Sequence, residues 1–349
     1  MGVAVIGAGY WGPNLIRNFA AHPACRVRWV HDVSEHRARR AIGTHSTIRV
    51  ASTLDQVLSD PKVDVVAIAT PAATHAGIAM AALAAGKHVV VEKPLACSVA
   101  EGAQLITAAE RSGRHLMVDH TYCYTPAVLA LRELSLSGVL GDIQYVDSVR
   151  INLGLVQSDV DVVWDLAPHD LSVLDVILPP ENRPVAVAAH CADPIGAGRA
   201  CVGYLSMPLA MGGIAHAHVN WLSPTKIRTT IVAGSKRTAV WNDLDPVQRL
   251  SVFDRGVDLE PAAGTLETRE RLQVSYRVGD MIAPALPETE PLQAMVCELV
   301  AAIREDRAPL TDGEMGLRVI ATLEAVSKSQ ATGGLAVPLA ANDSVGAAA

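Results

Sequence analysis

The chain has 349 residues and a formal net charge of −7, with half of its residues apolar and about a fifth charged. This length favours two domains over one, and the composition supplies enough apolar material for packed cores. The acidic balance argues against a nucleic-acid-binding protein, which usually presents a basic face. We therefore expect no nucleic-acid partner.

The sequence also predicts a cytoplasmic protein with no membrane span. Its start, MGVAVIGAGYWG, lacks the basic region of a signal peptide. The most apolar stretch, residues 65–86, is interrupted by Pro71, Thr74 and His75, which indicates a strand, a turn and a helix. The six cysteines are scattered without a CxxC pair, which predicts free thiols in a reducing compartment and no metal site.

Residues 1–120 alternate apolar segments with helical ones. Strands that are apolar throughout and separated by helices are typical of a parallel sheet covered on both faces. We therefore predict an α/β Rossmann domain, a doubly wound parallel sheet, over residues 1–120. The expected strands are Val3–Ile6, Val27–His31, Ile48–Val50, Val63–Ala69, Val89–Val91 and Leu116–Val118. The expected helices are Gly12–Ala21, Ser34–Ile42, Thr53–Leu58, Thr74–Ala85 and Val99–Ser112.

The pattern changes after residue 120, where short β-branched or alternating segments are bounded by turn residues. They predict an α+β domain over residues 121–339 with a large, open, mostly antiparallel sheet, followed by a flexible tail at 340–349. The expected strands are Ile143–Leu153, Val185–His190, Cys201–Met207, Gly213–Leu222, Ile227–Ala233 and Thr238–Asn242. The expected helices are Pro126–Ser137, Trp164–Ile177, Pro291–Glu305 and Gly316–Ser329.

A glycine turn follows the first strand. Residues 7–12, Gly-Ala-Gly-Tyr-Trp-Gly, match G-x-G-x-x-G between a strand and a helix, which is the context that dinucleotide binding requires. Gly7 permits the tight turn, Gly9 lets the backbone approach a pyrophosphate, and Gly12 lets helix and strand pack closely. Tyr10 and Trp11 lie in the same turn and are expected to contact the cofactor. The alternative is a tight turn without a ligand.

Asp32 ends the second strand, about 20 residues after Gly12. A carboxylate there accepts hydrogen bonds from the adenosine ribose and repels a 2′-phosphate, which favours NAD over NADP. Arg37, Arg39 and Arg40 follow it, and one of them could meet a phosphate instead. We interpret these arginines as a solvated helix face and expect NAD.

Two further turns fall at the same edge of the sheet. Thr70, Pro71 and His75 follow one strand, and Glu92 and Lys93 follow another. Ligands bind at the carboxyl ends of strands in such sheets, so both turns are candidate cofactor contacts. Lys93 would stand beside a nicotinamide ring, although a lysine that merely ends a strand at the surface is the alternative.

A second group of polar residues lies in VVWDLAPHDLSVLDVIL, residues 162–178. Asp165 and His169 are spaced i, i+4 and share a helix face, as an acid/base and its orienting carboxylate would. Pro168 predicts a kink or a late start of this helix. His120, Tyr122 and Tyr124 are polar aromatic residues at the domain junction that could line the cleft.

Taken together, these motifs resemble the Gfo/Idh/MocA oxidoreductases, with the glycine fingerprint, EKP at 92–94 and D-x-x-x-H at 165–169. The resemblance runs from Val3 to about Leu339. The phrases AVIGAGYWGPNLIRNF, VRINLGLVQ and VVWDLAPHDLSVL look more specifically like the WlbA-like branch, whose members oxidise the 3-hydroxyl of a UDP-linked sugar.

The resemblance implies that Lys93 and His169 flank the sugar carbon that exchanges hydride, with Asp165 beside the histidine. The Lys-Pro peptide is often cis in this family. Tyr122 and Asn152 are expected to join these three residues in binding the substrate. Cys123 stands where relatives often carry a larger polar residue, and this departure bears on substrate detail.

The implied function is NAD(P)-dependent hydride transfer to or from a secondary alcohol or ketone of a sugar, most fittingly C3 of a nucleotide-linked sugar. We expect Lys93 to bind and polarise the reacting oxygen while His169 exchanges the proton. A 3-keto-sugar reductase of secondary metabolism and an inositol-type dehydrogenase are alternatives, as is a non-catalytic NAD(P)-sensing regulator. Relatives pair subunits through the second sheet, so a homodimer or homotetramer is expected.

Overall fold

A computed structural model describes residues 1–339 except 46, 158–159 and 262–271, so the predicted tail at 340–349 lies outside the described residues. Within the described residues, six parallel strands form the first sheet, in the order β3-β2-β1-β4-β5-β6. The strand order reverses between β1 and β4, which is where such sheets bind their ligands. The strands are β1 (Gly2–Ile6), β2 (Arg26–His31), β3 (Arg49–Ala51), β4 (Val65–Ile68), β5 (His88–Glu92) and β6 (Leu116–Asp119).

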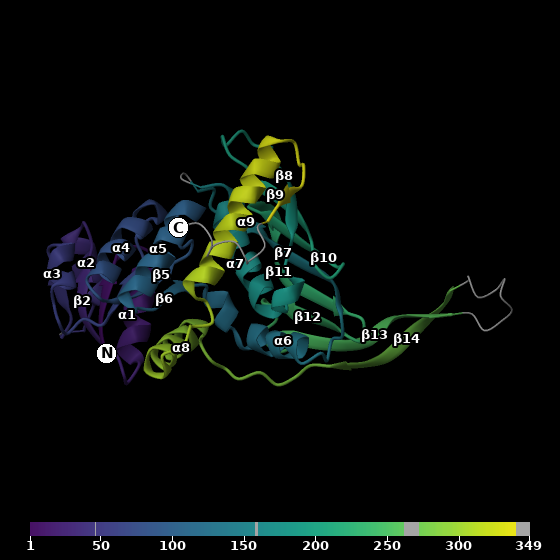
Figure 1. The fold of residues 1–349 in the computed structure, drawn as a ribbon, viewed down its shortest axis with the longest axis horizontal. Helices are drawn as coiled ribbons and strands as arrows, with labels where there is room; N and C mark the ends of the chain where they lie inside the picture. The colour runs from purple at the N-terminus through teal and green to yellow at the C-terminus, as the bar shows by residue number, and fades with distance from the viewer. Residues whose placement is uncertain (46, 158–159, 262–271, 340–349) are drawn as a thin grey trace.

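Helices cover both faces of this sheet (Figure 1), and the doubly wound Rossmann prediction is confirmed. Local signals set several of their ends: Ser34 and Ser98 cap helices by accepting backbone N–H groups, and Gly113 ends one with a left-handed φ of 61°. The elements are α1 (Gly12–Ala21), α2 (Glu35–Ile42), α3 (Leu54–Leu58), the short 3₁₀ helix η1 (Ala72–Thr74), α4 (His75–Ala84) and α5 (Val99–Ser112).

The second sheet has nine strands within the described ranges, in the order β14-β13-β12-β11-β7-β10-β9-β8-β15. The pair β7 and β10 is parallel and the other pairs are antiparallel, as predicted. The strands are β7 (Ile143–Leu153), β8 (Ala186–Ala192), β9 (Val202–Pro208), β10 (Ile214–Asn220), β11 (Leu222–Gly234), β12 (Thr238–Asn242), β13 (Leu250–Pro261), β14 (Leu272–Ile282) and β15 (Val337–Pro338).

The sequence analysis missed β13, β14 and β15. Asp254, Arg255 and Asp258 interrupt the apolar pattern of β13, and the strand depends on pairing and on ion pairs from Arg277 of β14 to Asp254 and Asp258. Beyond Phe253, β13 pairs with β14 alone, and this two-stranded arm projects from the molecule (Figure 1).

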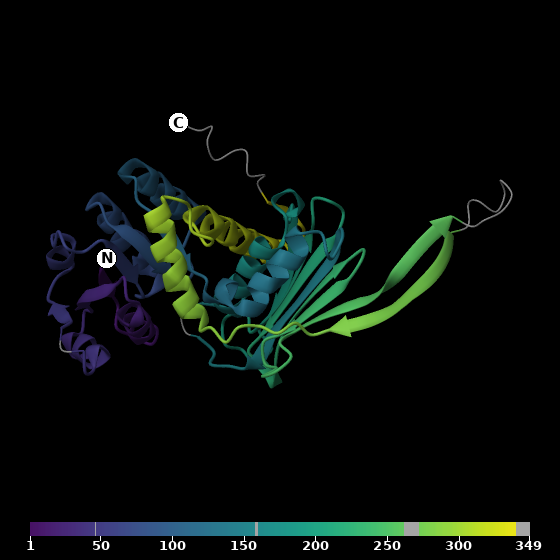
Figure 2. The same cartoon turned by 90° about the horizontal axis from the view of Figure 1, so that it is seen from below.

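Helices lie on one side of the second sheet, and the other side is uncovered (Figure 2). The helix that carries the D-x-x-x-H motif begins at Val162, two residues earlier than predicted, because the Asp161 carboxylate accepts the N–H groups of Val163 and Trp164. The late start expected from Pro168 is therefore wrong, since the helix runs through the proline. These elements are η2 (Thr121–Tyr124), α6 (Pro126–Leu136), α7 (Val162–Ile177), η3 (Pro180–Asn182), α8 (Pro291–Glu305) and α9 (Gly313–Ala331).

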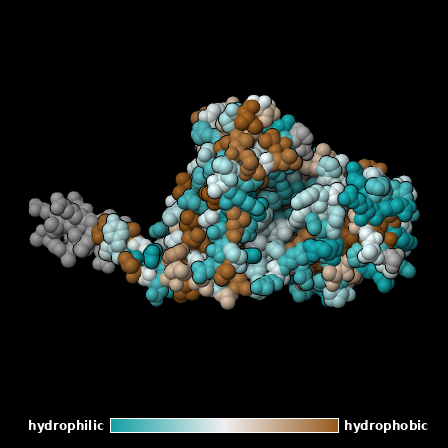
Figure 3. All heavy atoms as spheres, turned by 180° about the vertical axis from the view of Figure 1, so that it is seen from behind, coloured by the Kyte–Doolittle hydropathy of each residue, from teal (hydrophilic) through white to brown (hydrophobic). Residues whose placement is uncertain are grey.

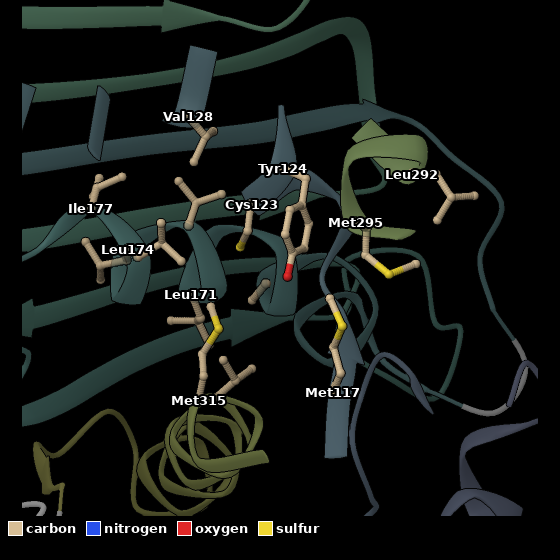
Figure 4. Close-up of a cluster of buried hydrophobic side chains, with 14 of the residues drawn as sticks. Met117, Cys123, Tyr124, Val128, Leu171, Leu174, Ile177, Leu292, Met295 and Met315 are labelled. Atoms are coloured by element: carbon tan, nitrogen blue, oxygen red, sulfur yellow. The ribbon is translucent and has the colours of Figure 1, made fainter. Parts of the chain in front are cut away.

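One apolar cluster extends through both sheets' helices and joins the two lobes. Met117 of β6, Met295 of α8 and Met315 of α9 converge on Tyr124, as Figure 4 shows. Tyr124 is 3% exposed, so it belongs to the core and does not line a cleft. The Thr311 hydroxyl donates its hydrogen bond to the Val118 carbonyl oxygen. The Tyr124 hydroxyl therefore donates to Thr311 Oγ1, at 2.8 Å.

Replacing Tyr124 by phenylalanine should lower the free energy of unfolding by about 1 kcal/mol, because one buried hydrogen bond is lost while the ring still packs. Chemical denaturation measures this change. Tyr276→Phe is the control: that side chain is 76% exposed, and its stability should stay within about 0.5 kcal/mol of the parent. Equal effects of the two changes would contradict the assignment of Tyr124 to the core.

Candidate active site

The carboxyl ends of the first sheet's strands bring the predicted cofactor residues to one edge. The glycine turn follows β1, Asp32 follows β2, Thr70 follows β4, and Lys93 follows β5. Parallel strands all end at the same edge, so residues far apart in the sequence gather there. Asp119 at the end of β6 joins them, although the sequence analysis did not select it.

The glycine turn has the backbone that a bound dinucleotide needs. Gly7 has a φ of +95°, and a Cβ there would lie 2.5 Å from the Ala69 carbonyl oxygen. A Cβ on Gly12 would lie 2.1 Å from the Gly7 carbonyl oxygen, whereas no described atom lies within 4 Å of one on Gly9. Helix α1 starts here with no acidic residue in its first turn. The open space at Gly9, next to the N-terminus of α1, fits the approach of a pyrophosphate.

Asp32 is held in place at the carboxyl end of β2 by four hydrogen bonds. It accepts the Ala8 N–H at 2.8 Å, the Ser34 N–H at 2.7 Å and two bonds from the Arg37 guanidinium. Burial opposes ionisation, but the bonds from Arg37, Ala8 and Ser34 outweigh it and hold the pKa of Asp32 below its usual value. The arginine best placed to meet a 2′-phosphate is thus already paired with a carboxylate.

The remaining predicted cofactor residues differ in their surroundings. Both ring nitrogens of His75 face backbone carbonyls, of Pro94 and Thr70, each at 2.8 Å, so this buried side chain ties the Thr70–Pro71 turn to the EKP turn. Tyr10 is 94% exposed. The Trp11 indole points inward and donates to Asp119 at 2.7 Å.

Lys93 reaches from the first lobe into the second. Its Nζ donates to the Asp165 carbonyl oxygen at 2.8 Å and lies 3.5 Å from the Asp165 carboxylate. The Lys93–Pro94 peptide is cis. Asp165 is held in turn by Trp221, whose Nε1 donates to Asp165 Oδ2 at 3.1 Å. Trp221 is buried. The sequence did not indicate a role for it in the site, because a tryptophan at the end of an alternating strand is typical of a core residue.

His169 lies one helical turn after Asp165 and is surrounded by positive charges. Burial first, and then Lys93 and Arg150, lower the pKa of this imidazole well below its usual value. The ring therefore stays neutral near neutral pH. Its buried Nδ1 has no hydrogen-bond partner among the described residues.

Two arginines that the sequence analysis did not select support this histidine through Tyr122. The Tyr122 ring meets His169 edge-on at 4.9 Å between centroids, and the Arg150 guanidinium lies 4.4 Å from the Tyr122 centroid. Arg228 donates to the Tyr122 hydroxyl at 2.6 Å. Arg150 is itself buried against Asp170, with Nε 2.9 Å from the carboxylate.

Asn152 lies near the end of β7, half-buried. Its Nδ2 and the Trp221 ring both approach Gly154, where a Cβ would lie 2.9 Å from the first and 3.2 Å from the second. The predicted substrate residues of the second lobe therefore gather around Trp221, Asp165 and His169.

Among the described residues, no group of three or more His, Cys, Asp or Glu side chains is arranged to hold a metal ion.

Comparison with known proteins agrees with this architecture. Residues 1–120 match the family model described as "Oxidoreductase family, NAD-binding Rossmann fold". The uncharacterized oxidoreductase YdgJ of Escherichia coli K12 is 31% identical over 248 residues, which cover 65% of this chain and 70% of that protein. The chain belongs to the Gfo/Idh/MocA oxidoreductase family.

Two further relatives align along nearly the whole chain. UDP-N-acetylglucosamine 3-dehydrogenase of Acidithiobacillus ferrooxidans is 27% identical, over 92% of this chain and 94% of its own; its structure superimposes with a TM-score of 0.78 at 26% identity, covering 94% and 97%. GenD2 from gentamicin A biosynthesis, solved in complex with NAD, is 26% identical with a TM-score of 0.79, covering 98% and 97%. The cofactor of this chain is NAD, as predicted.

No helix in the described part of the chain is long and apolar enough to cross a lipid bilayer.

Replacing Asp32 by alanine should change cofactor preference, because it frees Arg37 and removes the charge that repels a 2′-phosphate. The ratio of the NADH and NADPH dissociation constants should move toward NADPH by about tenfold, the equivalent of one charge-assisted hydrogen bond. Fluorescence titration measures both constants. Glu35→Ala, which frees Arg39 on the same helix, should leave the ratio unchanged. An unchanged ratio in Asp32→Ala would contradict the role given to this carboxylate.

Proposed function

We propose that this protein is an NAD-dependent sugar oxidoreductase that transfers hydride between nicotinamide and a secondary alcohol or ketone, at C3 of a nucleotide-linked sugar. One observation carries the proposal: the Lys93 ammonium crosses to the second lobe and contacts Asp165, one turn before His169. This contact supports a site in which an amine and an imidazole act on one substrate oxygen at the carboxyl edge of the first sheet. The 27% identity to a UDP-N-acetylglucosamine 3-dehydrogenase supports this choice of substrate.

The chemistry divides between the two groups. When bound, NAD accepts or returns the hydride at nicotinamide C4. His169 is neutral, so it takes the hydroxyl proton as the alcohol becomes a ketone and returns it in the reductive direction. Lys93 donates hydrogen bonds to the reacting oxygen and stabilises the negative charge that develops on it. Trp221 holds Asp165 in place through a hydrogen bond, and Asp165 in turn keeps the Lys93 amine at the cleft.

Arg150 and Arg228, which lie next to Tyr122, favour the role of His169 as the base. Their charges disfavour the imidazolium form of His169, which would be unable to accept a proton. Tyr122 and Asn152 are proposed to bind the sugar on the side of the second lobe. Cys123 is fully buried, so we do not expect it to contact the substrate.

Three alternatives lead to different results in one experiment. A 3-keto-sugar reductase would consume NADH only with a keto sugar, and an inositol-type dehydrogenase would reduce NAD with a cyclitol. A non-catalytic NAD-sensing regulator would bind NADH and turn over neither. We expect NADH absorbance to rise with UDP-linked N-acetylhexosamines or their uronic acids. A signal with inositol alone, or with none of these compounds despite NADH binding, would contradict the proposed function.

His169→Ala should lower kcat for sugar oxidation by about 10²–10⁴-fold, the usual contribution of a general base. Lys93→Met should also lower it, whereas His36→Ala, a change at an exposed helix position of the first lobe, should not. Since the pKa of His169 lies well below 6.5, the acid limb of kcat in the parent enzyme should also lie below pH 6.5. Near-parental turnover in both site variants would contradict the assigned roles.

We also propose that the uncovered face of the second sheet pairs with a second copy of the chain, giving a homodimer or a tetramer built from it. The register places Tyr145, Tyr204 and Ile214 on this face, each 39–50% exposed. The arm continues it: Val257 and Tyr276 are cross-strand partners on the same side, 54% and 76% exposed. Figure 3 shows hydrophobic residues along the arm and on the adjoining lobe. An apolar ribbon of two strands is marginal in water without a cover.

Val278→Asp should shift the protein toward monomer in sedimentation velocity, because Val278 is 83% exposed on the apolar side of the arm. Ser275→Asp places the same charge on the opposite, polar side and should leave the assembly intact. A parent protein that sediments as a monomer at micromolar concentration would contradict the pairing.

All six cysteines are free thiols, which supports the proposed cytoplasmic location.

A further inference from the structure

Asp119 connects the glycine turn to the strand that carries the EKP motif. It lies at the end of β6, where it is the register partner of Glu92 at the end of β5. The Trp11 indole N–H of the glycine turn donates to Asp119 Oδ2 at 2.7 Å. Asp119 is 1% exposed, so this bond is shielded from water. One carboxylate therefore contacts the glycine turn and lies beside the end of the strand that precedes Lys93.

The hydrogen bonds show which of the two carboxyl groups carries the charge. Asp119 receives a donor on each oxygen, from Trp11 and, at 2.6 Å, from the Thr121 hydroxyl. Glu92 Oε2 is buried and has no hydrogen-bond partner among the described residues. Two adjacent buried carboxyls do not both ionise readily. The charge thus belongs on Asp119 and the proton on Glu92.

Burial, and then the neighbouring Asp119 charge, raise the pKa of Glu92 well above its usual value. Burial raises the pKa of Asp119 as well, but its hydrogen bonds with Thr121, Trp11 and Glu92 act against that rise. A neutral Glu92 offers Lys93 no competing ion pair. The Lys93 ammonium is then left to Asp165 across the cleft, which is the contact that the proposed reaction uses.

We propose that Asp119 and Trp11 are positioning residues: their hydrogen bond fixes the glycine turn against the EKP strand, so that cofactor binding and the direction of Lys93 are set together. This inference rests on the proposed function for its effect on turnover. Its effect on cofactor binding does not depend on the identity of the sugar.

The first test compares two tryptophans of the same lobe. Trp11→Phe removes the N–H and keeps most of the ring, and we expect the NADH dissociation constant to rise about tenfold, as for one lost bond to a charged group. Trp29→Phe is the matched control, because Trp29 Nε1 donates to Asp60 at 2.8 Å away from the glycine turn. Trp29→Phe should lower the melting temperature without changing NADH affinity. If both variants lose stability equally and neither changes NADH affinity, the Trp11 bond is merely structural and the inference is wrong.

The second test uses the charge on Asp119. In Asp119→Asn the pKa of Glu92 should fall, because the neighbouring negative charge is gone, and ionised Glu92 then competes for Lys93 as pH rises. We expect turnover of Asp119→Asn to decline with rising pH where the parent does not. The double variant Glu92→Gln/Asp119→Asn should lack this decline. A profile of Asp119→Asn parallel to the parent would overturn the charge assignment. A parent without sugar turnover would instead refute the proposed function and leave the Trp11 test intact.

Discussion

The contact between Lys93 and Asp165 is the interaction on which the rest of this account depends. It brings an amine from the end of β5 to the first turns of α7, which belongs to the other lobe. A lysine with only 15% of its side chain exposed needs partners, and Asp165 supplies both a carbonyl and a carboxylate. Burial lowers the pKa of His169, and the same geometry lowers it further by putting the positive charge of Lys93 nearby. The edge of the first sheet, the Lys93 amine and the His169 imidazole are thereby fixed relative to one another through β5 and α7.

The sequence predicted the fold wherever local periodicity decides it. Strands β1, β4, β5 and β6 consist mainly of buried apolar residues and alternate with helical segments, so the sequence predicted their type and order. The sequence did not predict the arm, because Arg277, Asp254 and Asp258 are residue types common in loops. Only the pairing of β13 with β14 brings them together as ion pairs. The start of α7 depends on the Asp161 cap, which outweighs the interruption expected from Pro168.

The sequence predicted the motifs of the candidate site, but it did not predict the residues that hold those motifs in place. Lys93, Asp165 and His169 stand in short patterns whose spacing has a chemical meaning, and the structure brings them together. Trp221, Arg150 and Asp119 act through contacts between residues distant in sequence, and each looks like a common core or strand residue on its own. His75 has a further contact that its sequence position does not show: both of its ring nitrogens face backbone carbonyls, of Pro94 and Thr70.

The most direct measurement is a crystal structure of the protein with NADH and an unreactive analogue of the sugar. The account predicts that Lys93 Nζ and a ring nitrogen of His169 both lie within about 3 Å of the oxygen on one sugar carbon, with that carbon facing nicotinamide C4. A sugar bound elsewhere, or an oxygen contacted by neither side chain, would contradict the central claim.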